Sequence, residues 1–482
     1  MRGQKLQSLP DWTKRLLRMD FILLGLVGAL LAISIIYIQG IGRNIGAGSL
    51  GTYGIKQAVW AFAGFGIACT IAVIDYKIWG RYWVQIYAFG ILSLIAVLIF
   101  GITLNNATSW IKIGPITLQP SEIAKPCTIV ALAWVASQTQ RKMSDFWQII
   151  PVIIIGVLPI LLIGMQPDMG SGSTFIPTTA AVLFTAGIKK RVIFYPLTCV
   201  IIMSPLVYFM LAPHQKNRID VFIHPISHPI ALKRSASLIE EEKLHPKSLE
   251  TMQKMRNPLQ YTEALVNLLE IAKKNQLNPE VLPDLFGSTR PDLKLKYLLK
   301  KQSIILEEGV IPSTPHAFVT LRQFYLDAGW HAKQSLLSIG SGGFKGKGLG
   351  KSTQVKLGFL PQTVSTTDSI FAVIAEEGGF IMGTVIILLQ LGVFLCCIRI
   401  SSYASNTFGK CMALGIGTLF LYHIYINVGM AMNVAPILGI PLPFLSYGGS
   451  SVVAAMVSIG ILQSIYVHRE ESQSEQSLKG LS

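Results

Sequence analysis

Long apolar runs alternate with short polar segments along most of the chain, and one long polar stretch interrupts them in its second half. A helix that crosses a membrane needs about 20 mostly apolar residues, and about ten runs satisfy that rule. The predicted spans lie near residues 20–40, 56–75, 83–101, 122–138, 148–165, 172–188, 192–212, 371–398, 410–432 and 448–467. The pattern therefore predicts an all-α fold, a polytopic membrane helix bundle of about ten transmembrane helices.

The long polar stretch divides the predicted spans into two groups. We expect an N-terminal membrane bundle of about seven spans over residues 1–212 and a C-terminal bundle of about three spans over 371–468, followed by a tail at 469–482. Residues 213–370 form the long loop between them. Its part near 230–320 is charged and contains short amphipathic stretches at helical spacing, which predict a small helical insert.

Basic residues gather in alternate short loops, and this predicts the orientation of the chain. Cytoplasmic loops of membrane proteins carry an excess of Lys and Arg. With the N-terminus inside, all the basic segments fall in the cytoplasm together with the C-terminus. These segments are the N-terminus, Lys77/Arg81, Arg141/Lys142, Lys189/Lys190/Arg191, Arg399/Lys410 and His468/Arg469. The Gly- and Pro-rich loops, including the long one, then lie on the external face.

Composition supports a membrane protein and limits its partners. Charged residues make up 14% of the chain, whereas soluble domains carry about 25%. The net charge of +16 is explained by membrane orientation, so we expect no nucleic-acid partner. The 6 cysteines fall in or beside apolar segments without metal-ligand spacing, which is typical of small buried apolar residues.

The segment Pro441–Ser451, Pro-Leu-Pro-Phe-Leu-Ser-Tyr-Gly-Gly-Ser-Ser, separates the last two apolar runs. Its backbone groups would lack hydrogen-bond partners in hydrocarbon. Such a segment must therefore line a cavity or cap a helix at the membrane surface.

Charged residues within or beside the spans are candidates for chemistry, because charges there are costly. Glu122 and Lys125 are three residues apart and share one helical face, as functional groups or as a structural ion pair. Asp168 precedes the sixth span, where a helix N-cap is favoured over catalysis. Asp368 precedes the eighth span, and the residues alone do not decide between a helix cap and a general base.

Two basic segments could bind phosphate groups. The loop Lys345–Lys356 is rich in Gly and Lys and includes Lys347, which suits either a polyanionic ligand or a solvated loop. It has no clear phosphate-loop spacing and no preceding strand, so ATP is not expected. Arg218 follows the seventh span, where it could clamp a diphosphate or mark the end of a helix at the membrane surface.

Several motifs occur in a fixed order over most of the chain outside about 230–320. They are Trp110-Ile-x-Ile-Gly-Pro, Gln119-Pro-Ser-Glu-x-x-Lys125, Gln166-Pro-Asp-x-Gly170, Gln215-x-x-Arg218, Gln334-Ser-Leu-x-x-Ile-Gly-Ser-Gly-Gly343, Thr-Asp368-x-Ile-Phe-Ala-x-x-x-Glu-Glu377, Asn427-x-Gly-Met430 and the Pro441–Ser451 segment. With these motifs the chain resembles the SEDS family of bacterial cell-wall proteins, the RodA/FtsW/SpoVE group. Val73-Ile-Asp-Tyr76 and Asn105-x-x-x-Ser-Trp110 look closer to RodA than to FtsW.

The resemblance implies an enzyme, a peptidoglycan glycosyltransferase. Such an enzyme polymerises lipid II, an undecaprenyl-diphosphate-linked disaccharide peptide, at the outer face of the bacterial inner membrane during cell elongation and shape control. The implied partner is a class B penicillin-binding protein, which crosslinks the strands. The resemblance also implies help from a divalent cation, Mg²⁺ or Mn²⁺, and no organic cofactor, while no metal ligand is assigned.

The resemblance also implies roles for individual residues. The family's essential aspartate matches Asp368, which would deprotonate the acceptor 4-hydroxyl. Lys125 and Arg218 would stabilise the departing diphosphate, and Glu122 would orient Lys125. The expected catalytic residues are Asp368, Glu122 and Lys125, and the expected substrate-binding residues are Trp110, Gln119, Ser121, Asp168, Arg218, Lys347, Ser446, Tyr447 and Ser450.

Two features depart from the family pattern, and three other functions stay open. Gln362 stands where family members usually have Glu, with two extra residues before Asp368, and the segment near 230–320 is much shorter in family members. The alternatives are a lipid II flippase without chemistry, a non-catalytic scaffold for a penicillin-binding protein, and an FtsW-like role in division.

Overall fold

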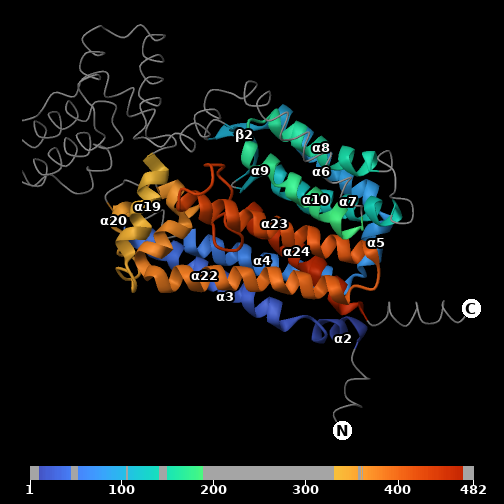
Figure 1. The fold of residues 1–482 in the computed structure, drawn as a ribbon, viewed down its shortest axis with the longest axis horizontal. Helices are drawn as coiled ribbons and strands as arrows, with labels where there is room; N and C mark the ends of the chain where they lie inside the picture. The colour runs from blue at the N-terminus through green and yellow to red at the C-terminus, as the bar shows by residue number, and fades with distance from the viewer. Residues whose placement is uncertain are drawn as a thin grey trace, which may run out of the picture.

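The long helices of the protein run side by side as one bundle in the computed structural model (Figure 1). Helix α2 (Asp11–Leu17) and the last residues of α24 (Gly449–Val467) lie at the same end of it, and α19 (Trp330–Gly342) lies at the other. This arrangement agrees with the even number of spans expected from the sequence. The structure describes residues 10–44, 53–104, 107–114, 116–139, 149–187, 330–356, 360 and 362–469.

Among the described residues, six helices are long and apolar enough to cross a membrane. They confirm the spans predicted at the corresponding places and the membrane bundle as the fold class. They are α3 (Phe21–Asn44), α4 (Tyr53–Val73), α6 (Trp83–Phe100), α22 (Ile370–Tyr403), α23 (Thr407–Ala431) and α24 (Gly449–Val467).

Three other predicted spans are helices in the structure, but they are not among the six that are long and apolar enough to cross a membrane. The fourth, α7 (Pro120–Thr139), includes two buried charged side chains, and the fifth, α8 (Ile150–Gly164), has 15 residues. The sixth is divided at Thr174 into α9 (Met169–Ser173) and α10 (Phe175–Thr185). The predicted span at 192–212 and the predicted insert near 230–320 lie outside the described residues. The remaining short helices are α5 (Tyr76–Arg81), α20 (Thr353–Lys356) and α21 (Gln362–Thr366).

A small antiparallel sheet, which the sequence analysis did not predict, precedes α7 within the all-α bundle. Strands β1 (Ile102–Leu104), β2 (Ala107–Ile113) and β3 (Ile116–Leu118) pair in the order β1-β2-β3. Alternating Thr, Ile and Trp side chains in β2 favour a strand over a loop. Gly114 has a φ of 61° and allows the tight turn between β2 and β3.

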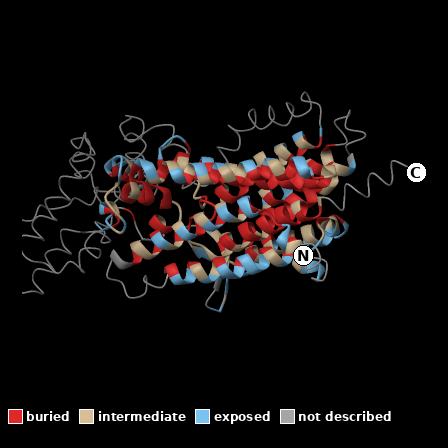
Figure 2. Cartoon of the chain, turned by 90° about the horizontal axis from the view of Figure 1, so that it is seen from below, coloured by how far each residue is buried: buried red, intermediate tan, exposed pale blue. Residues whose placement is uncertain are grey.

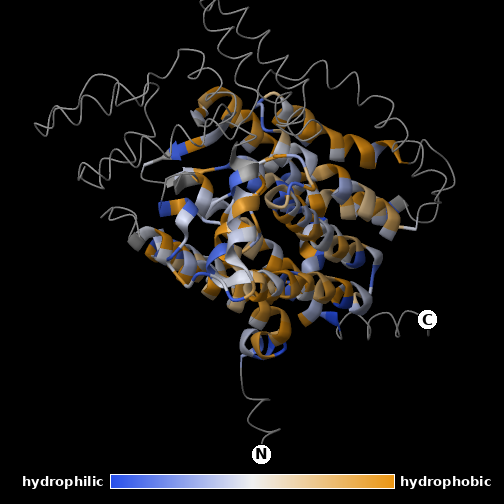
Figure 3. Cartoon of the chain, turned by 60° about the vertical axis from the view of Figure 1, so that its left-hand side comes forward, coloured by the Kyte–Doolittle hydropathy of each residue, from blue (hydrophilic) through white to orange (hydrophobic). Residues whose placement is uncertain are grey.

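Small residues let α4 and α24 approach each other closely. A Cβ atom on Gly64 would lie 2.8 Å from Cγ of Met456, and one on Gly460 would lie 2.8 Å from Cβ of Ile71. Small residues at such contacts are typical of helix packing in membranes. Buried residues concentrate on the inner faces of the helices (Figure 2), and apolar residues also cover the outer faces (Figure 3).

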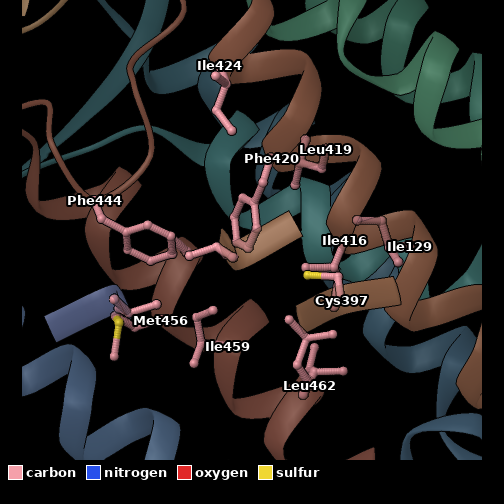
Figure 4. Close-up of a cluster of buried hydrophobic side chains, with 14 of the residues drawn as sticks. Ile129, Cys397, Ile416, Leu419, Phe420, Ile424, Phe444, Met456, Ile459 and Leu462 are labelled. Atoms are coloured by element: carbon pink, nitrogen blue, oxygen red, sulfur yellow. The ribbon is translucent and has the colours of Figure 1, made fainter. Parts of the chain in front are cut away.

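One core cluster joins the last three helices to the Pro441–Ser451 segment (Figure 4). The rings of Phe420 in α23 and Phe444 lie edge to face at 5.3 Å, and Met456 of α24 belongs to the same cluster. Phe444 has a φ of 62°, a backbone conformation that costs energy for a residue with a large side chain. Core packing therefore fixes the Pro441–Ser451 segment in a strained conformation.

Candidate functional site

Two opposite charges are buried near the start of α7. Glu122 and Lys125 form an ion pair of 2.6 Å between Oε1 and Nζ, and their side chains are 5% and 3% exposed. Their spacing of three residues places them on one face of the helix, as the sequence predicted. Ser121, the preceding residue, is fully buried. The ion pair is therefore present and lines a cavity, and the choice between a structural and a functional role for it stays a prediction.

That cavity lies between α7, α23, α24 and the Pro441–Ser451 segment. Glu122, Lys125 and His423 supply charged and polar groups to its wall, and Phe420 and Phe444 supply apolar ones. A concave apolar site with a few converging polar groups is the usual form of a ligand site. The cavity is therefore the structure's first candidate for a site near the predicted catalytic pair.

His423 of α23 is a site residue that the sequence analysis missed. Its Nε2 lies 3.3 Å from Nζ of Lys125, and its Nδ1 lies 3.1 Å from the carbonyl oxygen of Pro441. The side chain is almost fully buried. An ionisable residue inside a predicted span is itself a signal, because such residues are rare in membranes. His423 is therefore a site residue that the rarity of ionisable groups within spans could have indicated.

Polar side chains from within the spans hold the Pro441–Ser451 segment. Ser34 Oγ donates to the carbonyl of Leu445 at 2.7 Å, and Gln57 Nε2 donates to that of Ser446 at 3.1 Å. Gln390 Nε2 donates to the carbonyl of Pro443 at 2.7 Å. Irregular backbone at membrane depth is tolerated where protein groups satisfy it. The sequence analysis foresaw the irregular segment and missed these three partners.

The Pro441–Ser451 segment in turn holds the backbone around Asp368. Ser446 Oγ donates to the carbonyl of Thr367 at 2.6 Å, and the amide of Tyr447 donates to that of Thr366 at 2.8 Å. Asn427 Nδ2 donates to the carbonyl of Asp368 at 3.0 Å. Ser446 and Tyr447 thus position the Asp368 segment, and their predicted contact with substrate stays a prediction.

Asp368 itself is partly exposed and lies directly before α22. Ser369 occupies the N-cap position of that helix. Ser369 makes no side-chain cap hydrogen bond, and the choice between a helix cap and a general base for Asp368 stays a prediction.

A second network joins the end of the small sheet to α9 and α24. Asp168 caps α9 by accepting from the amide of Ser171 at 3.1 Å, so the capping prediction is confirmed. Its other oxygen accepts from Gln119 Nε2 at 3.2 Å. Ser450 Oγ accepts from the amide of Gln119 at 3.1 Å. Trp110 lies half-buried in β2. Substrate contacts of these residues stay predictions.

Lys347 is held by a buried carboxylate. Its Nζ lies 2.6 Å from Oε1 of Glu376. The carboxylate of Glu376 also accepts hydrogen bonds from the hydroxyls of Ser352 and Thr353, each at 2.6 Å. Glu377 accepts from the amide of Gly350 at 2.9 Å. The segment from Lys345 to Lys356 is thus folded around two glutamates, where the sequence left open a polyanion-binding loop or a solvated loop. Lys347 has a structural partner, and its binding to substrate stays a prediction.

Gly379 allows the segment from Lys345 to Lys356 to pack against α22 at Glu376 and Glu377. It breaks α22 with a φ of 67° and a ψ of −168°. A Cβ atom on it would overlap with the backbone nitrogen of Gly346. Backbone amides beyond the break therefore reach the loop, since Phe380 N donates to the carbonyl of Gly343 at 2.9 Å.

The structure offers no support for a protein-held metal ion within the part of the chain it describes. Those residues contain no group of three His, Cys, Asp or Glu side chains that could hold one. Mg²⁺ is usually bound through one or two carboxylates together with water and substrate phosphates, so this finding does not test the predicted cation. The predicted help from Mg²⁺ or Mn²⁺ stays a prediction. Arg218 lies outside the described residues.

Comparison with known proteins identifies the family. The family described as cell cycle protein, FtsW/RodA/SpoVE, matches residues 14–238 and 317–471. The chain belongs to the FtsW/RodA/SpoVE family. It is 34% identical over 455 residues to the peptidoglycan glycosyltransferase RodA of Treponema pallidum, covering 92% of this chain and 97% of that protein. It is 26% identical over 396 residues to the peptidoglycan glycosyltransferase MrdB of Escherichia coli K12, covering 82% and 80%.

Solved structures show the same fold. One described as "Structural coordination of polymerization and crosslinking by a peptidoglycan synthase complex" has a TM-score of 0.61 at 17% identity, covering 94% of this chain and 98% of that one. The crystal structure of Thermus thermophilus RodA has a TM-score of 0.54 at 17% identity, covering 94% and 97%. The family and membrane bundle predicted from the motifs are confirmed, and the glycosyltransferase prediction agrees with the relatives' names.

Proposed function

We propose that this protein polymerises lipid II into glycan strands at the outer face of the bacterial inner membrane, with both termini in the cytoplasm. The observation that carries the proposal is a physical link between the two predicted catalytic elements. Lys125 reaches the Pro441–Ser451 segment through His423, and that segment binds the backbone next to Asp368. Relatives named as peptidoglycan glycosyltransferases support the same activity.

The arrangement fits an inverting glycosyl transfer. Asp368 is the proposed general base that takes the proton of the acceptor 4-hydroxyl as that oxygen attacks the donor sugar. Lys125 is the proposed cation that stabilises the departing diphosphate, and a buried charge does so more strongly than one in water. Glu122, at 2.6 Å, fixes the direction of the Lys125 ammonium group.

The proposed partner is a class B penicillin-binding protein, and the proposed role is elongation. The structural relative described as a peptidoglycan synthase complex supports a partner of this kind. The RodA of Treponema pallidum is 34% identical, whereas the probable FtsW of Trichlorobacter lovleyi is 27% identical over 462 residues. The 34% identity to a RodA and the motifs at Val73–Tyr76 and Asn105–Trp110 support the elongation role.

A reconstitution test separates polymerisation from transport and from scaffolding. Purified protein and its partner, with the partner's crosslinking site blocked by penicillin, receive lipid II that carries a fluorescent label. Long glycan strands on a gel support the proposal. Movement of labelled lipid II across proteoliposomes without any polymer would favour the flippase. Neither activity, with the partner still bound, would favour the scaffold.

A further inference from the structure

His423 lies at the meeting point of three elements that are distant in the sequence. It belongs to α23, its Nε2 faces Lys125 of α7, and its Nδ1 faces the carbonyl of Pro441. Only 5% of its surface is exposed. A buried histidine can simply be a satisfied core residue, but this one lines the cavity with both members of the charged pair.

The partners of the two ring nitrogens determine which of them carries a proton. A lysine ammonium group has only donors, so Nε2 must accept from Lys125. A carbonyl oxygen only accepts, so Nδ1 must donate to Pro441. The ring therefore transmits a directed chain of hydrogen bonds from Lys125 to the Pro441–Ser451 segment, and a partner on one nitrogen sets the state of the other.

The Pro441–Ser451 segment, on which this chain ends, also holds the backbone beside the predicted general base. Within the segment that begins at Pro441, Ser446 binds the carbonyl of Thr367 at 2.6 Å, next to Asp368. The near end is the ammonium group, which Glu122 holds from the other side. His423 thus connects the element that carries the cation with the element that carries the carboxylate.

We propose that His423 is a positioning residue that fixes the Lys125 ammonium group relative to the Pro441–Ser451 segment and so to Asp368. The inference rests on the proposed function, because the fixed relation matters only if both groups act on one substrate. Small displacements of reacting groups lower rates by up to about 10²-fold. His423 contributes through Lys125 and need not touch the substrate.

Two variants separate the contact of the His423 ring with Pro441 from its contact with Lys125. In His423→Asn the side-chain amide is near the position of Nδ1, so it can donate to Pro441 while contact with Lys125 is lost. In His423→Gln the longer side chain places an oxygen near the position of Nε2, so it can still accept from Lys125. Both residues are polar and similar in size to His, which makes each a control for the other.

Kinetics of polymerisation should follow the contact with Lys125. We expect kcat to fall by about 10- to 100-fold in His423→Asn, with an intermediate loss in His423→Gln and little change in KM for lipid II. Rates are compared per folded protein, measured by gel filtration. Wild-type kcat in both variants, or a loss of folded yield alone, would overturn the proposal.

An NMR spectrum tests the hydrogen-bond geometry of His423 without an activity assay. The protein has 8 histidines, so ¹⁵N-histidine labelling in detergent gives few signals, and the one missing in His423→Gln belongs to His423. We expect a tautomer with the proton on Nδ1, and an altered Nε2 shift in Lys125→Met. A proton on Nε2, or no change in Lys125→Met, would overturn the inference. Absence of polymer from the wild type would instead overturn the proposed function.

Discussion

Removing one member of the Glu122–Lys125 pair should destabilise the protein more than removing both. The charges lie 2.6 Å apart and their side chains are 5% and 3% exposed, so either one alone would be a buried, unpaired charge. Breaking such a pair from one side costs about 3–5 kcal/mol. The double variant Glu122→Gln/Lys125→Met leaves no charge, so we expect it to cost less than either single variant and far less than the two added together.

The assay is reversible unfolding in mixed micelles of SDS and dodecyl maltoside, followed by tryptophan fluorescence. The matched control is the pair of Asp11 and Lys14, which has the same spacing of three residues but a distance of 3.3 Å and side chains that are 88% and 34% exposed. Exposed pairs contribute about 0–1 kcal/mol. Asp11→Asn and Lys14→Met should therefore change the free energy of unfolding only slightly.

Two results would refute this reasoning. One is a cost for Lys125→Met that is no larger than that for Lys14→Met, which would mean that the buried carboxylate of Glu122 does not need its partner. The other is simple additivity of the Glu122 and Lys125 variants, because residues in direct contact should show an interaction energy.

Three further variants test other parts of the account by the same unfolding assay. Gly379→Ala should cost about 1–3 kcal/mol from overpacking, with added backbone strain, whereas Gly25→Ala, with nothing within 4 Å of its Cβ, should cost far less. Equal costs would contradict the break in α22. Asp168→Ala should lose about 1 kcal/mol of capping and Asp168→Asn much less, and equal losses would argue against the cap. Ser446→Ala should cost about 1–3 kcal/mol by leaving the carbonyl of Thr367 without this donor, and no loss would refute that bond.

The spans were predictable because apolar runs of sufficient length have one stable form in a membrane. The same rule applies to α22, although Gly379 breaks its first part, since the run continues beyond the break. The small sheet was missed because β1 and β3 have three residues each, too few for a clear alternating pattern.

The site was only partly predictable, because its contacts join distant parts of the chain. Glu122 and Lys125 are neighbours on one helix, so their spacing alone predicted the pair. Gln57 binds a carbonyl 389 positions away, at Ser446, and no local pattern reports such a contact. The ion pair of Lys347 was not predicted for the same reason, since its partner Glu376 comes 29 positions later.

The most direct test of the account compares polymerisation by Asp368→Asn with that by Asp11→Asn. Both variants remove one carboxylate, but Asp368 adjoins the Pro441–Ser451 segment whereas Asp11 lies exposed in α2. With labelled lipid II and the penicillin-binding partner, we expect strands from the wild type and from Asp11→Asn, and none from Asp368→Asn although it still binds lipid II. Strands from Asp368→Asn at the wild-type rate would contradict the central claim and place the base elsewhere.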